Sequence, residues 1–261
     1  MTDISQQTPI LETRGLTKHY GGVHALTEAS FALQRGEHVA IMGDNGAGKS
    51  TFVRQITGVE MPTRGQIVFD GVEQSFKSPI EAREAGIETV FQTLALADDL
   101  DVPSNLFLGR EKIRFNLGPF SVLDKKAMRE AAMAALTKTG VKIPNLLNTI
   151  RNMSGGQRQC VAIARTAAFK SKLVIMDEPT AALGVQETAQ VENIIRTLKE
   201  AGEPLILISH NMRQVFDLVD RIVVFRRGRI VANLRKEDTS GEDVVSYITG
   251  AKTGAEFAGA A

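Results

Sequence analysis

The stretch GDNGAGKST at residues 43–51 lies between an apolar run at 38–42 (HVAIM) and a helical pattern at 50–57. It fits the pattern G-x-x-x-x-G-K-[ST], whose glycines let backbone N–H groups close around phosphate oxygens. The lysine of this pattern brings a positive charge to the β- and γ-phosphates, and the following hydroxyl binds Mg²⁺. The alternative is an ordinary glycine-rich turn before a helix. The sequence predicts a phosphate-binding loop, with Ser50 as a metal ligand, made of Gly43, Asp44, Asn45, Gly46, Ala47, Gly48, Lys49, Ser50 and Thr51.

A second pair of candidate residues closes another apolar run. Residues 173–178 read LVIMDE, so four apolar residues are followed by two carboxylates. Ligands of open α/β sheets bind at the carboxyl ends of the strands, where these two side chains are expected. We predict that Asp177 binds Mg²⁺ through a water molecule and that Glu178 is the base, or the positioner, of an attacking water. A strand that simply ends in a solvated Asp-Glu pair is the alternative.

The remaining chain alternates between short apolar runs and helical patterns, which is typical of an α/β protein. Buried strands are expected at 38–42, 87–91, 172–176 and 204–208. Strands of an antiparallel part are expected at 28–33 and 66–69. A hairpin around Arg227-Gly228 is expected between strands at 222–225 and 229–233.

Strand signals fade between about residues 95 and 170, where we expect a mostly helical insertion. A helix is predicted at 125–139, with Asp124 as its N-cap and Gly140 as its C-cap. The expected fold class is therefore α/β, a P-loop NTPase core with a mixed sheet, an N-terminal antiparallel β part and this insertion. We expect a single domain over 1–250 and a flexible tail at 251–261.

The composition narrows the classes of function. Of 261 residues, 31 are basic and 30 acidic, so the formal net charge of +1 provides no basic field for a nucleic-acid partner and, over the whole chain, no electrostatic attraction to an anionic membrane. The single cysteine, Cys160, cannot form an internal disulfide, which fits a reducing compartment. The N-terminus does not read as a signal peptide, and no apolar stretch approaches the roughly 20 residues of a membrane helix. If the protein works at a membrane, another chain is expected to hold it there.

A further motif, Met153-Ser154-Gly155-Gly156-Gln157, lies between the two candidate sites. Ser154 and Gln157 form an S-x-x-Q capping box that opens a helix expected at 158–168, and a capped helix start is the purely structural interpretation. In this order of motifs the sequence resembles an ATP-binding cassette (ABC) ATPase, whose signature is usually LSGGQ. Met153 stands where that signature has leucine. The resemblance implies that two copies pair and that the motif binds ATP held by the opposite copy, through Ser154, Gly155, Gly156 and Gln157.

The family pattern assigns roles to three more residues. Tyr20, in the stretch HYGG, matches the aromatic residue that stacks on adenine, although a half-buried strand aromatic is the alternative. Gln92 matches the glutamine that contacts Mg²⁺ and water, and His210 matches the histidine that contacts the γ-phosphate. The resemblance therefore implies a catalytic set of Glu178, His210, Gln92 and Lys49. The other histidines are expected to be structural, namely His19, His24 and His38.

Other stretches resemble the carbohydrate-import branch of the family, namely GDNGAGKST, FLGRE at 107–111, EPTAALG at 178–184 and ISHNM at 208–212. Many relatives have an aspartate where this chain has Gly184, which puts in doubt the cross-talk between ATP sites that this aspartate supports. The single-cassette length matches the fructose-type members.

The resemblance implies a peripheral ATPase at the cytoplasmic face of the inner membrane that uses ATP and Mg²⁺. Its expected function is to power uptake of a fructose- or ribose-like monosaccharide. Its expected partners are a second copy, transmembrane permease subunits and, indirectly, an extracytoplasmic sugar-binding protein. The alternatives are the ATPase subunit of an ABC transporter for another small solute, a subunit of an ABC exporter, a soluble ABC protein acting on ribosomes or DNA, and a regulatory nucleotide-binding module with little turnover.

Overall fold

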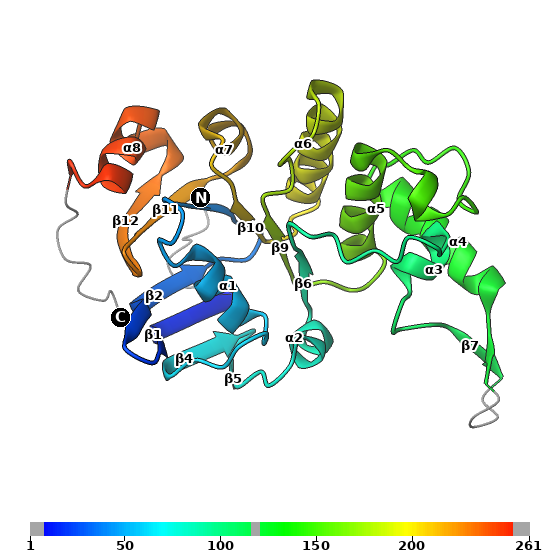
Figure 1. The fold of residues 1–261 in the computed structure, drawn as a ribbon, viewed down its shortest axis with the longest axis horizontal. Helices are drawn as coiled ribbons and strands as arrows, with labels where there is room; N and C mark the ends of the chain where they lie inside the picture. The colour runs from blue at the N-terminus through cyan, green and yellow to red at the C-terminus, as the bar shows by residue number, and fades with distance from the viewer. Residues whose placement is uncertain (1–7, 116–120, 253–261) are drawn as a thin grey trace. The chain divides into compact units, whose positions relative to one another are not determined.

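A computed structural model of the chain describes residues 8–115 and 121–252 (Figure 1). The chain divides into two compact units. The first consists of Met1–Thr89, Lys172–Glu178 and Lys199–Ala261, and the second of Val90–Ser171 and Pro179–Leu198. Of the tail expected at 251–261, residues 253–261 lie outside the described residues. No helix in the described ranges is long and apolar enough to cross a membrane.

The fold contains a six-stranded sheet, in the order β12-β11-β3-β10-β9-β6. The strands β11, β3, β10 and β9 run parallel to one another, and β12 pairs antiparallel with β11. Every residue of β3 and β10 is buried, which is why these strands read as continuous apolar runs. The bounds are His38–Met42 for β3, Ile87–Val90 for β6, Leu173–Asp177 for β9, Leu205–Ile208 for β10, Arg221–Arg226 for β11 and Arg229–Arg235 for β12.

A four-stranded antiparallel sheet lies in the first unit, in the order β2-β1-β4-β5. Its strands are Leu11–Tyr20 (β1), Val23–Leu33 (β2), Arg64–Phe69 (β4) and Val72–Gln74 (β5). The helices of the first unit are α1 (Lys49–Ile56), α2 (Pro79–Ala85), α7 (Met212–Leu218) and α8 (Gly241–Thr249), with a 3₁₀ turn at Lys236–Asp238.

The second unit is mainly helical and has a core of its own. Its helices are α3 (Val102–Leu106), a 3₁₀ turn at Ile150–Asn152, α4 (Lys125–Lys138), α5 (Gly155–Ala167) and the part of α6 (Val185–Glu200) that ends at Leu198. Leu106, Met128 and Val161 come from α3, α4 and α5 and lie in one buried cluster. A two-stranded ribbon joins α3 to α4, formed by Ile113–Phe115 (β7) and Val122–Leu123 (β8).

The expected fold class is confirmed, and several element bounds need correction. The strand expected at 28–33 is only the second half of β2, and β1 was not expected because Gly15, at φ 58°, interrupts its alternation of side chains. The insertion also contains the β7–β8 ribbon, which the sequence does not indicate. Asp124 caps α4 by accepting the N–H of Ala127 at 2.9 Å. Thr139 is the C-cap of α4, and Gly140 follows it with φ 68°.

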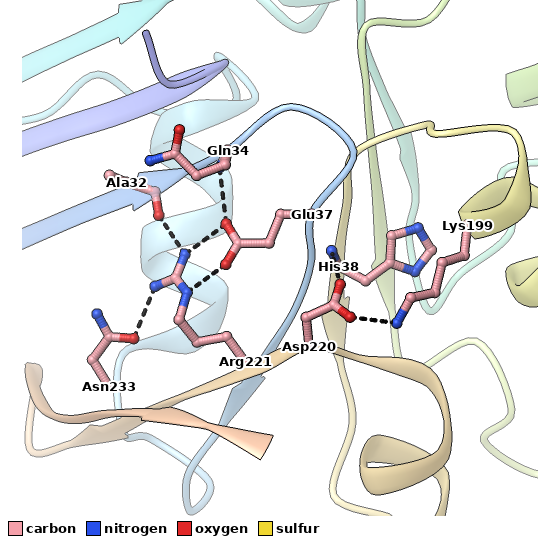
Figure 2. A network of polar contacts seen from close by, with 8 residues as sticks. All are labelled: Ala32, Gln34, Glu37, His38, Lys199, Asp220, Arg221 and Asn233. Carbon is pink, nitrogen blue, oxygen red and sulfur yellow. Dashed lines mark hydrogen bonds and ion pairs between the residues drawn. The ribbon is translucent and has the colours of Figure 1, made fainter. Parts of the chain in front are cut away.

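A polar network fixes the amino ends of β3 and β11 (Figure 2). Arg221 donates from Nε and Nη2 to the two oxygens of Glu37 at 2.6 and 2.9 Å. Asp220 accepts from the backbone N–H of His38 at 3.0 Å and from Lys199 Nζ at 2.6 Å. Because charge-assisted bidentate pairs fix geometry, this network holds neighbouring strands of the sheet in register.

The network contains a buried histidine that predicts how stability depends on pH. His38 is 0% exposed, its Nε2 lies 3.0 Å from the carbonyl oxygen of Glu203, and burial lowers its pKa. The unfolded chain takes up this proton near pH 6.5, whereas the folded chain does so only at lower pH. We therefore expect the free energy of unfolding to fall between pH 7 and pH 5, by at most about 1.4 kcal/mol per pH unit from this group.

Urea unfolding at several pH values measures this effect, with His38→Asn as the matched variant. The variant is expected to be less stable at pH 7 and to lose less stability on acidification. Burial acts to raise the pKa of Asp220, but its bonds to Lys199 and to the His38 N–H lower this pKa overall, so Asp220 contributes only in a lower pH window. An equal slope for the variant and the natural chain between pH 7 and pH 5 would contradict the assignment to His38.

Candidate functional site

The phosphate loop connects β3 to α1 in a conformation that only glycine allows at two positions. Gly43 has φ 147°, and a Cβ there would lie 2.2 Å from the carbonyl oxygen of Phe225. Gly48 has φ 104°, and its Cβ would lie 2.9 Å from the carbonyl oxygen of Ala25. Between them, Asp44, Asn45 and Gly46 are exposed, and Ala47 is buried. The loop is thus shaped by backbone contacts with β2 and β11 as well as by its own glycines.

Lys49 is the first residue of α1 and reaches back across the loop. Its Nζ donates to the carbonyl oxygens of Gly43 at 2.6 Å and Asp44 at 2.9 Å. Burial lowers the pKa of Lys49, and the negative charges of Glu178 and Asp177 oppose this shift. The N-cap Gly48 supplies no side-chain bond, and no acidic residue occupies the first turn of α1, which also contains Ser50 and Thr51. A positive charge and free N–H groups therefore lie together, as an anion site requires.

The two carboxylates lie at the carboxyl end of β9, as predicted. Asp177 is the last residue of β9, and the N–H of Glu178 donates to the carbonyl oxygen of Ile208 at 2.9 Å. Burial, followed by the charge of Glu178, raises the pKa of Asp177, so this carboxylate gains from a nearby cation. Glu178 has φ 51°, a conformation that costs energy in a non-glycine residue and is common at active sites.

His210 follows β10 and contacts the second carboxylate. Its Nδ1 lies 2.9 Å from Oε1 of Glu178, and its side chain is 80% exposed, against 17% for Glu178. The structure therefore brings Lys49, Asp177, Glu178 and His210 to one edge of the sheet in the first unit. A carboxylate paired with a histidine at a phosphate loop has the parts for general base chemistry on a water molecule.

Tyr20 ends β1 and is 42% exposed. Its hydroxyl donates to a carboxylate oxygen of Glu60, and Nζ of Lys18 lies 5.4 Å from the centre of its ring. Burial and the bond to Glu60 raise the pKa of the Tyr20 hydroxyl. The ring is held in one place and remains accessible, which suits the predicted stacking on a base.

The signature motif opens α5 in the second unit. The Ser154 hydroxyl accepts the N–H of Gln157 at 3.2 Å, and the Gln157 side chain accepts the N–H of Ser154 at 3.0 Å, which confirms the capping box. The helix begins at Gly155, three residues before the expected start. A Cβ at Gly155 would have no described atom within 4 Å, so its backbone is open to a ligand. Met153, which replaces the usual leucine, is buried in the core of this unit.

Gln92 lies just after β6 and is exposed. It belongs to the second unit, as does the signature motif, whereas the phosphate loop, Asp177 and His210 belong to the first. Their predicted roles at the nucleotide therefore remain predictions. His19 and His24 contact each other with ring centres 4.0 Å apart, in keeping with structural roles.

The oxygen donors of the first unit suit Mg²⁺. This ion takes one or two carboxylates together with substrate phosphates and water, and does not need a cage made only of protein. Ser50 supplies a hydroxyl, and Asp177 a half-buried carboxylate whose pKa is raised by burial and then by the charge of Glu178. No cluster of three or more His, Cys, Asp or Glu side chains in residues 8–115 and 121–252 could hold a metal by itself.

The sequence matches the ABC transporter family over residues 26–181, more than half of its length. The chain belongs to this family. A fructose import ATP-binding protein of Rhizobium meliloti is 48% identical over 94% of this chain and 96% of that protein. A xylose/arabinose import ATP-binding protein of Sulfolobus acidocaldarius is 42% identical over 92% and 94%. A ribose import ATP-binding protein of Mesorhizobium japonicum is 36% identical, but this ABC chain covers only 46% of it.

Solved structures agree with the family assignment. The ATP-binding cassette MJ1267 of an ABC transporter is 27% identical, has a TM-score of 0.79, and is matched over 92% of this chain and 99% of its own. The P-loop NTPase core expected from the sequence is thereby confirmed for this ABC protein.

The structure adds contacts that the sequence does not indicate. The N–H of Gly228, in the β11–β12 turn, donates to the carbonyl oxygen of Ala47 at 2.9 Å and ties that turn to the phosphate loop. Glu187, in the first turn of α6, packs on the signature helix, where a Cβ on Gly156 would lie 2.0 Å from its Cγ. Its Oε2 lies 2.6 Å from the position of a Cβ on Gly184. The carboxylate of Glu187 thus occupies the space that a side chain at position 184 would need, which favours glycine there.

This packing predicts the effect of a small substitution in the signature. Gly156→Ala should lower the free energy of unfolding by about 1–3 kcal/mol, because the new methyl group overlaps the middle of the Glu187 side chain. Glu187→Ala in the same chain should recover only part of the loss, because it removes Cγ but keeps the Cβ of residue 187, which lies 2.7 Å from the position of the new methyl group. Urea unfolding of the two single variants and the double variant measures the coupling. Additive losses would show that the two residues do not meet.

Proposed function

We propose that this chain is the ATP-hydrolysing subunit of an importer that moves a monosaccharide through a separate transmembrane permease. The observation that carries the proposal is the set at the sheet edge, where Lys49, Asp177, Glu178 and His210 converge on the phosphate loop. A site that only binds a nucleotide needs the phosphate loop and its lysine. A site that also hydrolyses the nucleotide needs a general base, and the carboxylate of Glu178 paired with His210 can fill that role.

Each residue has a chemical task in this proposal. The backbone N–H groups of the loop and the Lys49 ammonium hold the phosphates and oppose the charge that develops during cleavage. Ser50 would hold Mg²⁺ directly and Asp177 through a water molecule, and the ion would supply positive charge that neutralises the phosphates. Glu178 accepts a proton from the attacking water, and His210 fixes the orientation of that carboxylate through the 2.9 Å contact.

A second copy completes each site in this proposal. The amides of Gly155 and Gly156, together with Ser154, lie at a capped helix start that is open at Gly155, whereas Glu187 covers Gly156. Such a helix end binds anions, and the γ-phosphate held by the opposite copy is the anion we assign to it. Gln92 of the second unit contributes to Mg²⁺ and water, and Tyr20 stacks on adenine. ATP binding then closes the dimer, and hydrolysis opens it.

The sugar assignment rests on relatives that match almost the whole chain. Two relatives are covered over at least 94% of their own length, and they are described as fructose and xylose/arabinose import proteins. Their common substrate class is a monosaccharide, which the permease and an extracytoplasmic binding protein select. In this role the chain works at the cytoplasmic face of the inner membrane.

Uptake of labelled sugars tests the proposed function. Deletion of the gene should abolish uptake of one pentose or hexose, and the natural chain should restore it. Glu178→Gln, produced at the same level, should not restore it. Normal uptake of every sugar tested, with a defect in uptake of another small solute, would reject the sugar assignment and leave the ATPase assignment in place.

A further inference from the structure

The β7–β8 ribbon exposes apolar side chains that no core requires. Ile113 pairs with Leu123, and Phe115 pairs with Val122, in a sheet that joins no other strand among residues 8–115 and 121–252. The four side chains are 51%, 43%, 56% and 49% exposed, respectively. Figure 1 shows β7 extending away from α3 and α4. A core of the same unit lies close by in sequence, since Leu106 and Phe107 are almost completely buried in it.

Such a ribbon is poorly suited to water. An isolated two-stranded ribbon is marginally stable, because its apolar side chains have nothing to pack against. Four of the five residues in β7 and β8 are nevertheless large and apolar, and the fifth is Arg114. Contiguous apolar residues kept at the surface indicate a partner that covers them.

The charges around the ribbon indicate the chemistry of this partner. Six basic and two acidic residues lie between positions 110 and 129, in a chain whose total net charge is only +1. The two acidic side chains are used locally. Glu111 accepts the N–H of Gly109 at 3.0 Å, and Asp124 accepts the N–H of Ala127 at 2.9 Å. The basic side chains of Lys112, Arg114, Lys125 and Lys126 are exposed.

Two of these cations are placed against the preference of their own helix. Lys125 and Lys126 occupy the first turn of α4, where the helix dipole favours negative charge. Lys126 has one carboxylate at 4.0 Å, that of Glu130, and the two side chains are 89% and 69% exposed. An external anion bound beside α4 would offset the cost of this arrangement.

We propose that the β7–β8 ribbon inserts into the interface of an anionic lipid membrane. Ile113, Phe115, Val122 and Leu123 enter the boundary between headgroups and acyl chains, while the four cations face lipid phosphates. A projecting ribbon fits a fluid lipid surface, which adapts to convex shapes and attracts clustered Lys and Arg side chains. The contact is additional to the proposed permease and does not depend on the ATP site.

The absence of tryptophan from the sequence allows a direct test with the full chain. Phe115→Trp places one fluorophore on the ribbon, and Ile80→Trp places another at a residue of α2 that is 59% exposed. Vesicles of phosphatidylglycerol should shift the emission of the first variant to shorter wavelength and leave the second unchanged. Brominated lipid should quench only the first.

Charge and apolar contributions are separated by vesicle sedimentation. Removing Lys125 and Lys126 together, as glutamines, should weaken binding to phosphatidylglycerol vesicles by roughly fivefold per lysine, and added salt should weaken it further. Phe115→Ser should also weaken binding, whereas Ile80→Ser should not, and ATP hydrolysis should be unchanged in all of these variants. Equal sedimentation with neutral phosphatidylcholine vesicles, or no emission shift on anionic vesicles, would overturn the proposal.

Discussion

Lys49→Ala is expected to lower ATP hydrolysis by about a hundred- to thousandfold, the usual effect of removing one preorganised charge from a transition state. The charged neighbours that act on the Lys49 ammonium are Glu178, Asp177 and Asp44, and all of them are negative. Without the lysine, the phosphates would meet these carboxylates with no protein cation between them. The variant should also bind ATP more weakly, because Nζ no longer bridges the loop carbonyls of Gly43 and Asp44.

Steady-state phosphate release measures this prediction, with two controls. Lys77→Ala removes an exposed lysine of the same unit and should leave the rate unchanged. A melting temperature close to that of the natural chain would show that Lys49→Ala is folded. Turnover within threefold of the natural rate would reject the role assigned to the phosphate loop.

Glu178→Gln is expected to keep ATP binding and to lower the rate of hydrolysis by about a hundred- to ten-thousandfold. Residue 178 has a backbone φ of 51°, and glutamine there keeps the shape of the glutamate side chain. Its amide, however, cannot accept a proton from water. Burial and the charge of Glu178 together raise the pKa of Asp177, so the neutral amide should also relieve Asp177 of one repulsion. Affinity for ATP should therefore be equal or higher.

Equilibrium binding of ATP and size-exclusion chromatography distinguish this outcome from simple unfolding. The variant should elute as a dimer with ATP and as a monomer without it. His210→Ala is the companion variant, because it removes the partner 2.9 Å from Glu178 and should reduce kcat. Normal turnover by Glu178→Gln, with no ATP-dependent dimer, would contradict both the role of the base and the shared site.

Much of the fold could be predicted because its buried strands are short apolar runs. All residues of β3 and β10 are buried, so their sequences carry the signal by themselves. In contrast, β1 contains polar residues that tertiary contacts bury, such as Thr13 and Thr17, and a glycine with positive φ. The β7–β8 ribbon gave no signal in the expected helical region, because its strands have only three and two residues.

The candidate site was predictable where chemistry depends on residues that are adjacent in sequence. The phosphate loop, the carboxylates after β9 and the capping box each lie within one short stretch. The packing of Glu187 on Gly156 depends on tertiary structure, as does the bond from Gly228 to Ala47. These contacts join segments whose sequences do not indicate that they meet.

The central claim is that each ATP site combines the phosphate loop of one copy with the signature of another. Two mixtures test it, both in the Glu178→Gln background, with ATP retained per heterodimer as the measurement. Heterodimers of a Lys49→Ala chain and a Ser154→Arg chain should retain one ATP. Their one intact site combines the phosphate loop of the Ser154→Arg chain with the signature of the Lys49→Ala chain. Heterodimers of a chain carrying both substitutions and a chain carrying neither should retain no ATP. In each of their two sites, either the phosphate loop carries Lys49→Ala or the signature of the other chain carries Ser154→Arg. The reverse pattern would place the whole site within one chain and contradict the account.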